Sequence, residues 1–111
     1  NMRAGYLYIT STPAMPNIVK LGVTRRINPL SRIQELSSAS VPTPCVCHGL
    51  VFSDVLFALG TAVHKYFDAQ RVNKANGHKE FFAISPSDAI SALRDVFHVD
   101  VHFVNEQEEE E

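Results

Sequence analysis

Residues 5–24 read GYLYITSTPAMPNIVKLGVT, and this stretch decides the fold. The first run is aromatic and β-branched and it alternates, so its two tyrosines share one face of a strand while Leu7 and Ile9 share the other. A turn with two prolines follows, and residues 18–23 form a second apolar run that contains one glycine. Because the connection is short, we expect a β-hairpin at the start of the domain.

The remaining sequence predicts helices and strands in turn. Asn28 caps a helix with Pro29 at its first position, and Ser53 and Ser85 precede two further helical patterns. The later elements are expected as a strand at 45–52, a helix from 54 to about 69, a short strand at 80–84, a helix from 86 to about 97 and an edge strand at 99–104. This order predicts an α/β fold with a small, mainly antiparallel sheet: a three-stranded core, extra edge strands and flanking helices.

The bulk composition fits one small domain. The chain has 111 residues, 45% of them hydrophobic, and we expect one unit at residues 3–104. Its formal net charge is −2, but five of the 12 acidic residues lie in the last six positions. Residues 105–111 are therefore expected to be an acidic disordered tail, and the body is mildly basic. No run is long enough for a membrane span and no signal peptide is recognisable, so a cytoplasmic location is expected.

The two cysteines, Cys45 and Cys47, are separated by one residue in the third predicted strand. Such neighbours on one strand face do not easily close a disulfide. A zinc site needs about four ligands, and His48 is the one further candidate nearby. We interpret both cysteines as ordinary strand residues in a reducing compartment.

The first half of the chain offers groups that suit phosphodiester chemistry, which needs a base, an acid and a cation that balances charge on the phosphate. Tyr6 and Tyr8 share a strand face, and Lys20 lies in an otherwise apolar strand. A lysine favours the ionised form of a nearby phenol, and guanidinium groups such as those of Arg25 and Arg26 bind phosphate bidentately. Each also has a structural interpretation, as a half-buried tyrosine, a solvent-facing lysine or a surface arginine.

The second half adds weaker candidates. His64 lies on the second predicted helix. Its side chain is a candidate general acid or base, or a structural residue that covers the edge of the core. Gly60 stands one turn earlier, where glycine costs about 1 kcal/mol relative to alanine, and the sequence shows no packing reason for it. Arg71 and Lys74 lie in a polar loop and are candidates for nucleic-acid binding. We interpret Glu80 as a structural partner of Arg71.

Taken in order, these motifs resemble the GIY-YIG nuclease superfamily, in the phage-type branch whose second motif is Lys-(Ile/Leu)-Gly. The resemblance spans roughly residues 4–96 and includes the KLG of the second strand, the AVHKYF of the second helix and the KEFF near residue 80. It implies a three-stranded antiparallel core sheet flanked by helices. It also implies a DNA endonuclease that depends on a divalent metal, Mg²⁺ or Mn²⁺, held by a glutamate on the second helix.

Carried onto this chain, the resemblance assigns Tyr6 or Tyr8 to the first-motif tyrosine and puts Lys20 where most members have the second. Arg32 would clamp the scissile phosphate, and His64 would be the histidine of the second helix. The metal-binding glutamate would fall on Gly60. We therefore predict a metal-dependent DNA endonuclease domain that is weak or inactive in this chain.

Three accounts of this glycine remain open: an engineered or selected change, a natural loss of cutting with DNA binding retained, or a carboxylate relocated to Glu80. The expected partner is single- or double-stranded DNA, with no membrane, and a homodimer would supply the surface that one small domain lacks. The alternative function is a non-catalytic nucleic-acid-binding module. A third is a protein-interaction domain that uses Phe81, Phe82 and the acidic tail.

Overall fold

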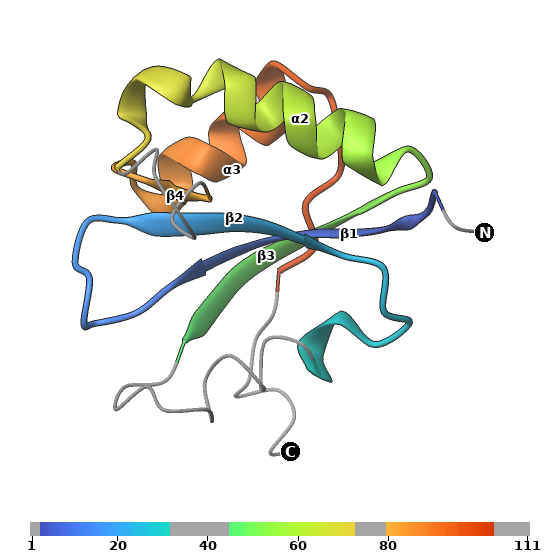
Figure 1. The fold of residues 1–111 in the computed structure, drawn as a ribbon, viewed down its shortest axis with the longest axis horizontal. Coiled ribbons are helices and arrows are strands. Elements are labelled where there is room, and N and C mark those ends of the chain that lie inside the picture. The colour runs from blue at the N-terminus through green and yellow to red at the C-terminus, as the bar shows by residue number, and fades with distance from the viewer. Residues whose placement is uncertain (1–2, 32–44, 73–79, 104–111) are drawn as a thin grey trace.

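A computed structural model of the chain describes residues 3–31, 45–72 and 80–103 (Figure 1). Four antiparallel strands form one sheet in the order β3-β1-β2-β4. The elements are β1 (Gly5–Ser11), β2 (Val19–Thr24), β3 (Val46–Ser53), α2 (Leu56–Tyr66), the 3-10 helix η1 (Asp68–Gln70), β4 (Phe81–Phe82) and α3 (Pro86–Asp95). The α/β class and the mainly antiparallel sheet are as predicted, with β3, β1 and β2 as the core and β4 at the edge.

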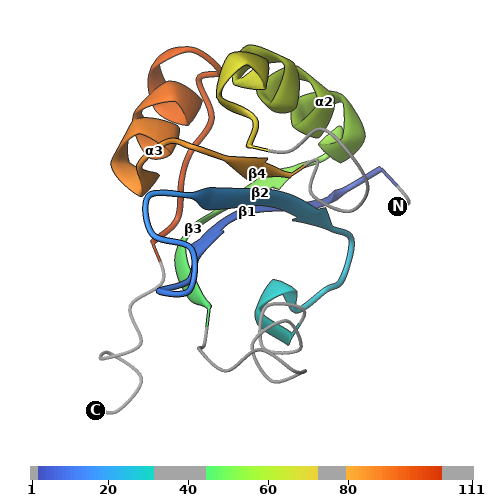
Figure 2. The ribbon, with the colours of Figure 1, turned by 60° about the vertical axis from the view of Figure 1, so that its left-hand side comes forward.

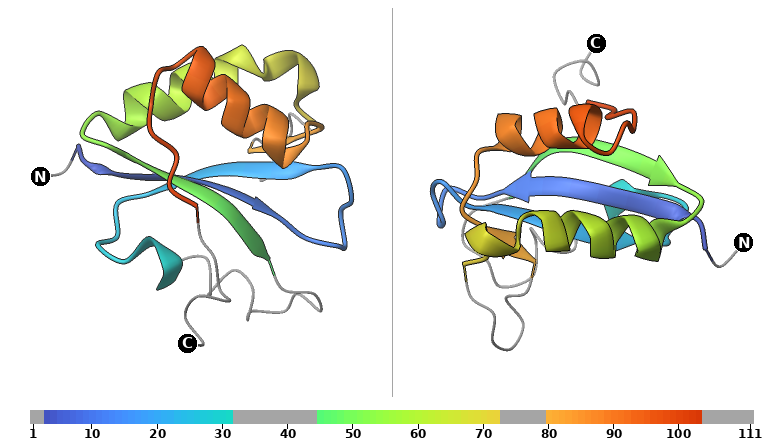
Figure 3. Two further views of the ribbon diagram at one scale, coloured as in Figure 1. Left: turned by 180° about the vertical axis from the view of Figure 1, so that it is seen from behind. Right: turned by 90° about the horizontal axis from the view of Figure 1, so that it is seen from above.

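Both α2 and α3 cover the same face of the sheet (Figure 3). The inward side chains of β1 and β2 alternate with outward ones, as expected for a strand. Burial of this face drives folding, because each apolar side chain removed from water contributes roughly 1.5–3 kcal/mol. The centre of this core is formed by Leu7, Ile9, Val19, Leu21, Val51, Leu56, Val63, Phe82 and Leu93, all of them fully buried.

The opposite face of the sheet carries a second, smaller cluster. Tyr8 and Leu50 are buried there, with Tyr6 and Leu30 packed against them. Leu30 belongs to a helical turn that begins at Pro29 and lies on the side of the sheet away from α2 and α3 (Figure 2). The Asn28 side-chain oxygen accepts a hydrogen bond from the Leu30 amide at 3.1 Å, so the predicted cap is confirmed.

The second helix differs from its prediction in its start and in its inward face. It begins at Leu56, two residues later than predicted, and the Leu56 amide donates to the Arg3 carbonyl at 3.0 Å, which ties the helix to the chain before β1. The buried side is formed by Leu56, Gly60 and Val63. The sequence predicts Val55, Leu59, Val63 and either Tyr66 or Phe67 on the inward face. Val63 and Phe67 are buried as predicted, whereas Val55 is half exposed.

The remaining expectations are met in part. The Ser85 hydroxyl accepts from the Asp88 amide at 3.0 Å, which confirms the cap of α3. The predicted edge strand at 99–104 is reduced to an isolated bridge between His102 and Leu50, and residues beyond 103 lie outside the described part. None of the helices in the described segments has the length and apolar character that a membrane span requires.

Two glycines allow close approaches. A Cβ at Gly22 would overlap the Tyr8 ring, which crosses β2 at this point. A Cβ at Gly60 would lie 3.1 Å from Val23 Cγ1, where α2 packs on β2. Gly60 therefore has a packing reason that the sequence did not reveal.

We expect Gly22→Ala to destabilise the domain by about 1–3 kcal/mol, because the Tyr8 ring must move to make room. The matched control is Gly60→Ala, in which a gain in helix propensity of about 1 kcal/mol offsets the tight contact with Val23. Chemical denaturation of the two variants measures both effects. Equal stability of Gly22→Ala and the native protein would contradict the assigned Tyr8–Gly22 contact.

Candidate functional site

Several of the predicted site residues gather around Leu21, Gly22 and Val23 of β2. One edge of β2 pairs with β1 along its length, whereas β4 pairs with the other edge only at Val19 and Lys20. Within the described segments, no strand continues that pairing past Leu21. We call this part of β2 the outer edge.

On the face away from α2 and α3, Tyr8 and Lys20 lie together beside the outer edge. The Tyr8 ring rests over Gly22, and Tyr8 is only 2% exposed. The Lys20 ammonium lies 5.8 Å from the centre of the Tyr8 ring and 5.9 Å from the centre of the Phe81 ring. It also lies 3.8 Å from Glu80 Oε1, so a carboxylate balances its charge. Lys20 is thus held by two aromatic rings and one anion.

From the other face, α2 brings His64 and Gly60 to the same edge. His64 Nε2 is 2.7 Å from the Leu21 carbonyl oxygen, which can only accept, so Nε2 carries the proton. The His64 ring also stands 5.3 Å from the Phe82 ring. Gly60 abuts Val23 two residues further along β2. The predicted residues therefore approach the outer edge from both sides of the sheet.

Tyr6 lies apart from this group. Its ring makes an edge-to-face contact with Phe52 at 5.6 Å and borders a hollow of about 280 Å³ at the end of the sheet. Arg25 and Arg26, just after β2, line the same hollow. Of the two tyrosines, Tyr8 is therefore the one next to Lys20.

Arg71, predicted as a nucleic-acid-binding residue, makes several contacts within the domain. Its guanidinium donates to Asp68 Oδ1 at 3.0 Å and to the His64 carbonyl at 3.2 Å, and it lies over the Phe82 ring. The expected pair of Arg71 with Glu80 is wrong, because β4 places Glu80 beside Lys20 instead. Arg32 and Lys74 lie outside the described residues.

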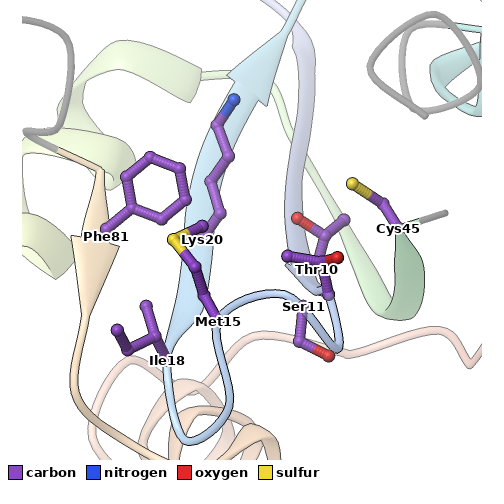
Figure 4. Close-up of a pocket in the computed structure, with 8 residues that line it drawn as sticks. Thr10, Ser11, Met15, Ile18, Lys20, Cys45 and Phe81 are labelled. Carbon is purple, nitrogen blue, oxygen red and sulfur yellow. The ribbon is translucent and has the colours of Figure 1, made fainter. Parts of the chain in front are cut away.

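A pocket of about 160 Å³ adjoins the Lys20 side chain, as Figure 4 shows. The lysine runs along one wall, with Met15 and Phe81 on one side and Thr10 and Cys45 on the other. The lining is mostly apolar, and Lys20 is the one charged side chain among the described residues that form it. This pocket was not predicted from the sequence, although Met15, an apolar residue in a turn with two prolines, is a signal for it.

The described residues do not fit a metal ion. No group of three histidine, cysteine, aspartate or glutamate side chains comes together in the parts of the chain that the structure describes. Gly60 offers no side-chain ligand for a metal, and the Glu80 carboxylate is already paired with Lys20.

Cys45 and Cys47 do not form a disulfide, and His48 Nε2 forms a hydrogen bond with the Ser11 hydroxyl at 2.7 Å. Burial lowers the pKa of His48, which favours its neutral form.

The fold and the edge site define a small α/β domain with a four-stranded antiparallel sheet. The family model of the T5orf172 domain matches residues 5–97, and the chain belongs to this family. No curated protein and no solved structure gives a significant match. The expected membership of the GIY-YIG nuclease superfamily is therefore wrong, since the match is to the T5orf172 domain. The roles that rested on that resemblance, above all a metal position at Gly60, now depend on geometry alone.

The assignment of Arg71 as structural can be tested by Arg71→Met, which keeps an unbranched side chain but loses the charge. We expect a loss of about 1–3 kcal/mol in unfolding free energy, because the contacts to Asp68 and the His64 carbonyl disappear. Affinity for DNA at a temperature well below the midpoint of unfolding should stay within about twofold. A large loss of affinity with unchanged stability would return Arg71 to the binding surface.

Proposed function

We propose that this domain binds DNA by holding backbone phosphates along the outer edge of β2. The observation that carries the proposal is the position of Lys20, an ammonium fixed beside Tyr8 and Phe81 in an otherwise apolar strand. A lysine fixed by neighbouring rings loses less conformational freedom when it binds an anion than a mobile surface lysine does.

The arginines after β2 extend this line of positive charge. Arg25 and Arg26 follow Lys20 by five and six residues, so at strand rise the cations span about 15–20 Å. Such a length matches several phosphates of one DNA strand. The mild positive charge of the body without its acidic tail agrees with this proposal.

Glu80 sets the strength of the proposed contact. Its carboxylate is 3.8 Å from Lys20 Nζ and competes with a phosphate for the same ammonium. A phosphate that approaches the edge must therefore displace this carboxylate or share the lysine with it. The pair is partly exposed, so its own contribution to stability is small.

The test compares variants of opposite sign by fluorescence anisotropy at several salt concentrations. Lys20→Gln should weaken DNA binding about 5- to 10-fold and lower the salt slope by about 1, since one phosphate contact is lost. Glu80→Gln should instead tighten binding, because it removes the competing carboxylate. Lys65→Gln is the matched control, since Lys65 is an exposed lysine on α2. Equal effects of Lys20→Gln and Lys65→Gln would refute the proposed contact.

A DNA endonuclease is the second candidate function. It is favoured by the presence of Tyr8, Lys20, His64 and Glu80 around three consecutive residues of β2, since these side chains include donors and acceptors of protons. Gly60 lies one turn from His64 on the same helix and adjoins the same edge. We propose that cutting in this chain is weak or absent for want of a carboxylate at this position.

The endonuclease candidate is tested by Gly60→Glu against Gly60→Gln. Both variants add a side chain of the same length against Val23 and share its packing cost, but only the glutamate adds a charge. Cleavage of single- and double-stranded DNA with Mn²⁺ is expected in Gly60→Glu alone. If neither variant nor the native protein cuts, the endonuclease candidate is removed and the binding proposal stands.

A further inference from the structure

Large apolar side chains are exposed at the end of the sheet where β1 begins and β2 and β3 end. Phe52 is 53% exposed, Phe57 is 56% exposed and Ile27 is 97% exposed. These side chains lie in residues 25–27 and 52–58. Together with residues 3–6 at the start of β1, these segments hold three arginines and one aspartate. Exposed aromatic faces and an excess of positive charge therefore occur together at this end.

The backbone holds these side chains in fixed relative positions. The Leu56 amide donates to the Arg3 carbonyl at 3.0 Å, which joins the start of α2 to the chain before β1. The Arg25 guanidinium lies 5.4 Å from the centre of the Phe57 ring, and Tyr6 contacts Phe52 edge to face. Both exposed phenylalanines are thus supported on one side by a neighbouring group.

Two hollows of about 280 Å³ each lie at this end. Arg25, Arg26 and Phe52 line one of them, and Arg3 and Phe57 line the other. Arg25 connects the two, because it lines the first hollow and rests on the phenylalanine of the second. A ligand that runs across this end meets an aromatic ring and a guanidinium group in each hollow.

This combination selects the chemistry of the ligand. Arginine binds phosphate, and an exposed ring offers a surface on which a nucleobase stacks. Base pairs in a duplex are stacked on one another and present no free face. A duplex would therefore contact the arginines through its phosphates, but its bases would not stack on the phenylalanine rings. An acidic peptide would likewise satisfy the charges without the rings. A single strand satisfies both.

We propose that unpaired bases of a DNA strand stack on Phe52 and Phe57, so that the domain prefers single-stranded or frayed DNA. The inference rests on the proposed binding of DNA phosphates along β2. Arg25 and Arg26 follow β2, so a strand bound there would reach this end of the sheet. The phosphates give sequence-independent affinity, and the two phenylalanines give the preference for unpaired bases.

The experiment measures anisotropy of three labelled probes of equal length: a thymidine single strand, the same strand made abasic, and a duplex. The variant is Phe52→Ala/Phe57→Ala, with Phe57→Ala alone as a second variant that leaves the Tyr6–Phe52 contact intact. Phe103→Ala is the matched control. Phe103 is 61% exposed, and the Arg94 guanidinium lies 5.0 Å from the centre of its ring. Phe103 follows His102, which bridges to Leu50 of β3, so it lies outside the proposed site.

We expect the double variant to lose about tenfold or more in affinity for the thymidine strand, with Phe57→Ala between it and the native protein. Affinities for the abasic strand and the duplex should change less than about twofold, and Phe103→Ala should match the native protein. Equal losses on all three probes, or no loss on the thymidine strand, would overturn the inference alone. If the native protein binds none of the probes, the proposed function itself fails.

Discussion

The contact of the Tyr8 ring with the backbone of Gly22 is the constraint on which the arrangement of the site depends. The ring crosses from β1 to β2 because β2 has no side chain at that point. It fills the second apolar cluster of the sheet with Leu50, and the Lys20 ammonium lies over the face of its ring. Tyr8 thus packs in the second apolar cluster and also fixes the position of the Lys20 ammonium. A β2 strand with any larger residue at 22 would move the ring and leave the lysine without its support.

The sequence was sufficient where short-range rules apply. The alternation of residues 5–24 predicted both strands of the hairpin, since the period of two is a property of the extended chain. Asn28 and Ser85 were recognised as caps because a cap depends on residues two or three positions away. Tyr8, Lys20 and His64 were selected as candidates through the order of the motifs and not through a short-range rule. The three residues lie around the outer edge of β2, and their roles stay predictions.

What the sequence missed depends on contacts between distant elements. The Leu56 amide at the start of α2 donates to the Arg3 carbonyl, and Leu56, Gly60 and Val63 form the buried side of the helix. A glycine at position 60 lowers helix propensity, but the close packing of Val23 leaves little room for a side chain there. Because β4 pairs with β2, Glu80 forms an ion pair with Lys20, and Arg71 forms one with Asp68. Asp68 is three residues from Arg71, but the other partners are distant in sequence, so no local pattern predicts them. The family also escaped motif reading, since short motifs suggested GIY-YIG whereas the match over residues 5–97 is to the T5orf172 domain.

The shortness of β4 has a consequence for how the molecule meets copies of itself. An edge strand with open amide and carbonyl groups is a template on which another chain can add a strand, and such addition leads to aggregation. The bond from His64 to the Leu21 carbonyl occupies one of these groups with a side chain, and the charge of Lys20 lies beside the same edge. Another β-strand would have to displace the histidine and approach the ammonium group. The side chains that surround the candidate site thus oppose the addition of another strand at this edge of β2.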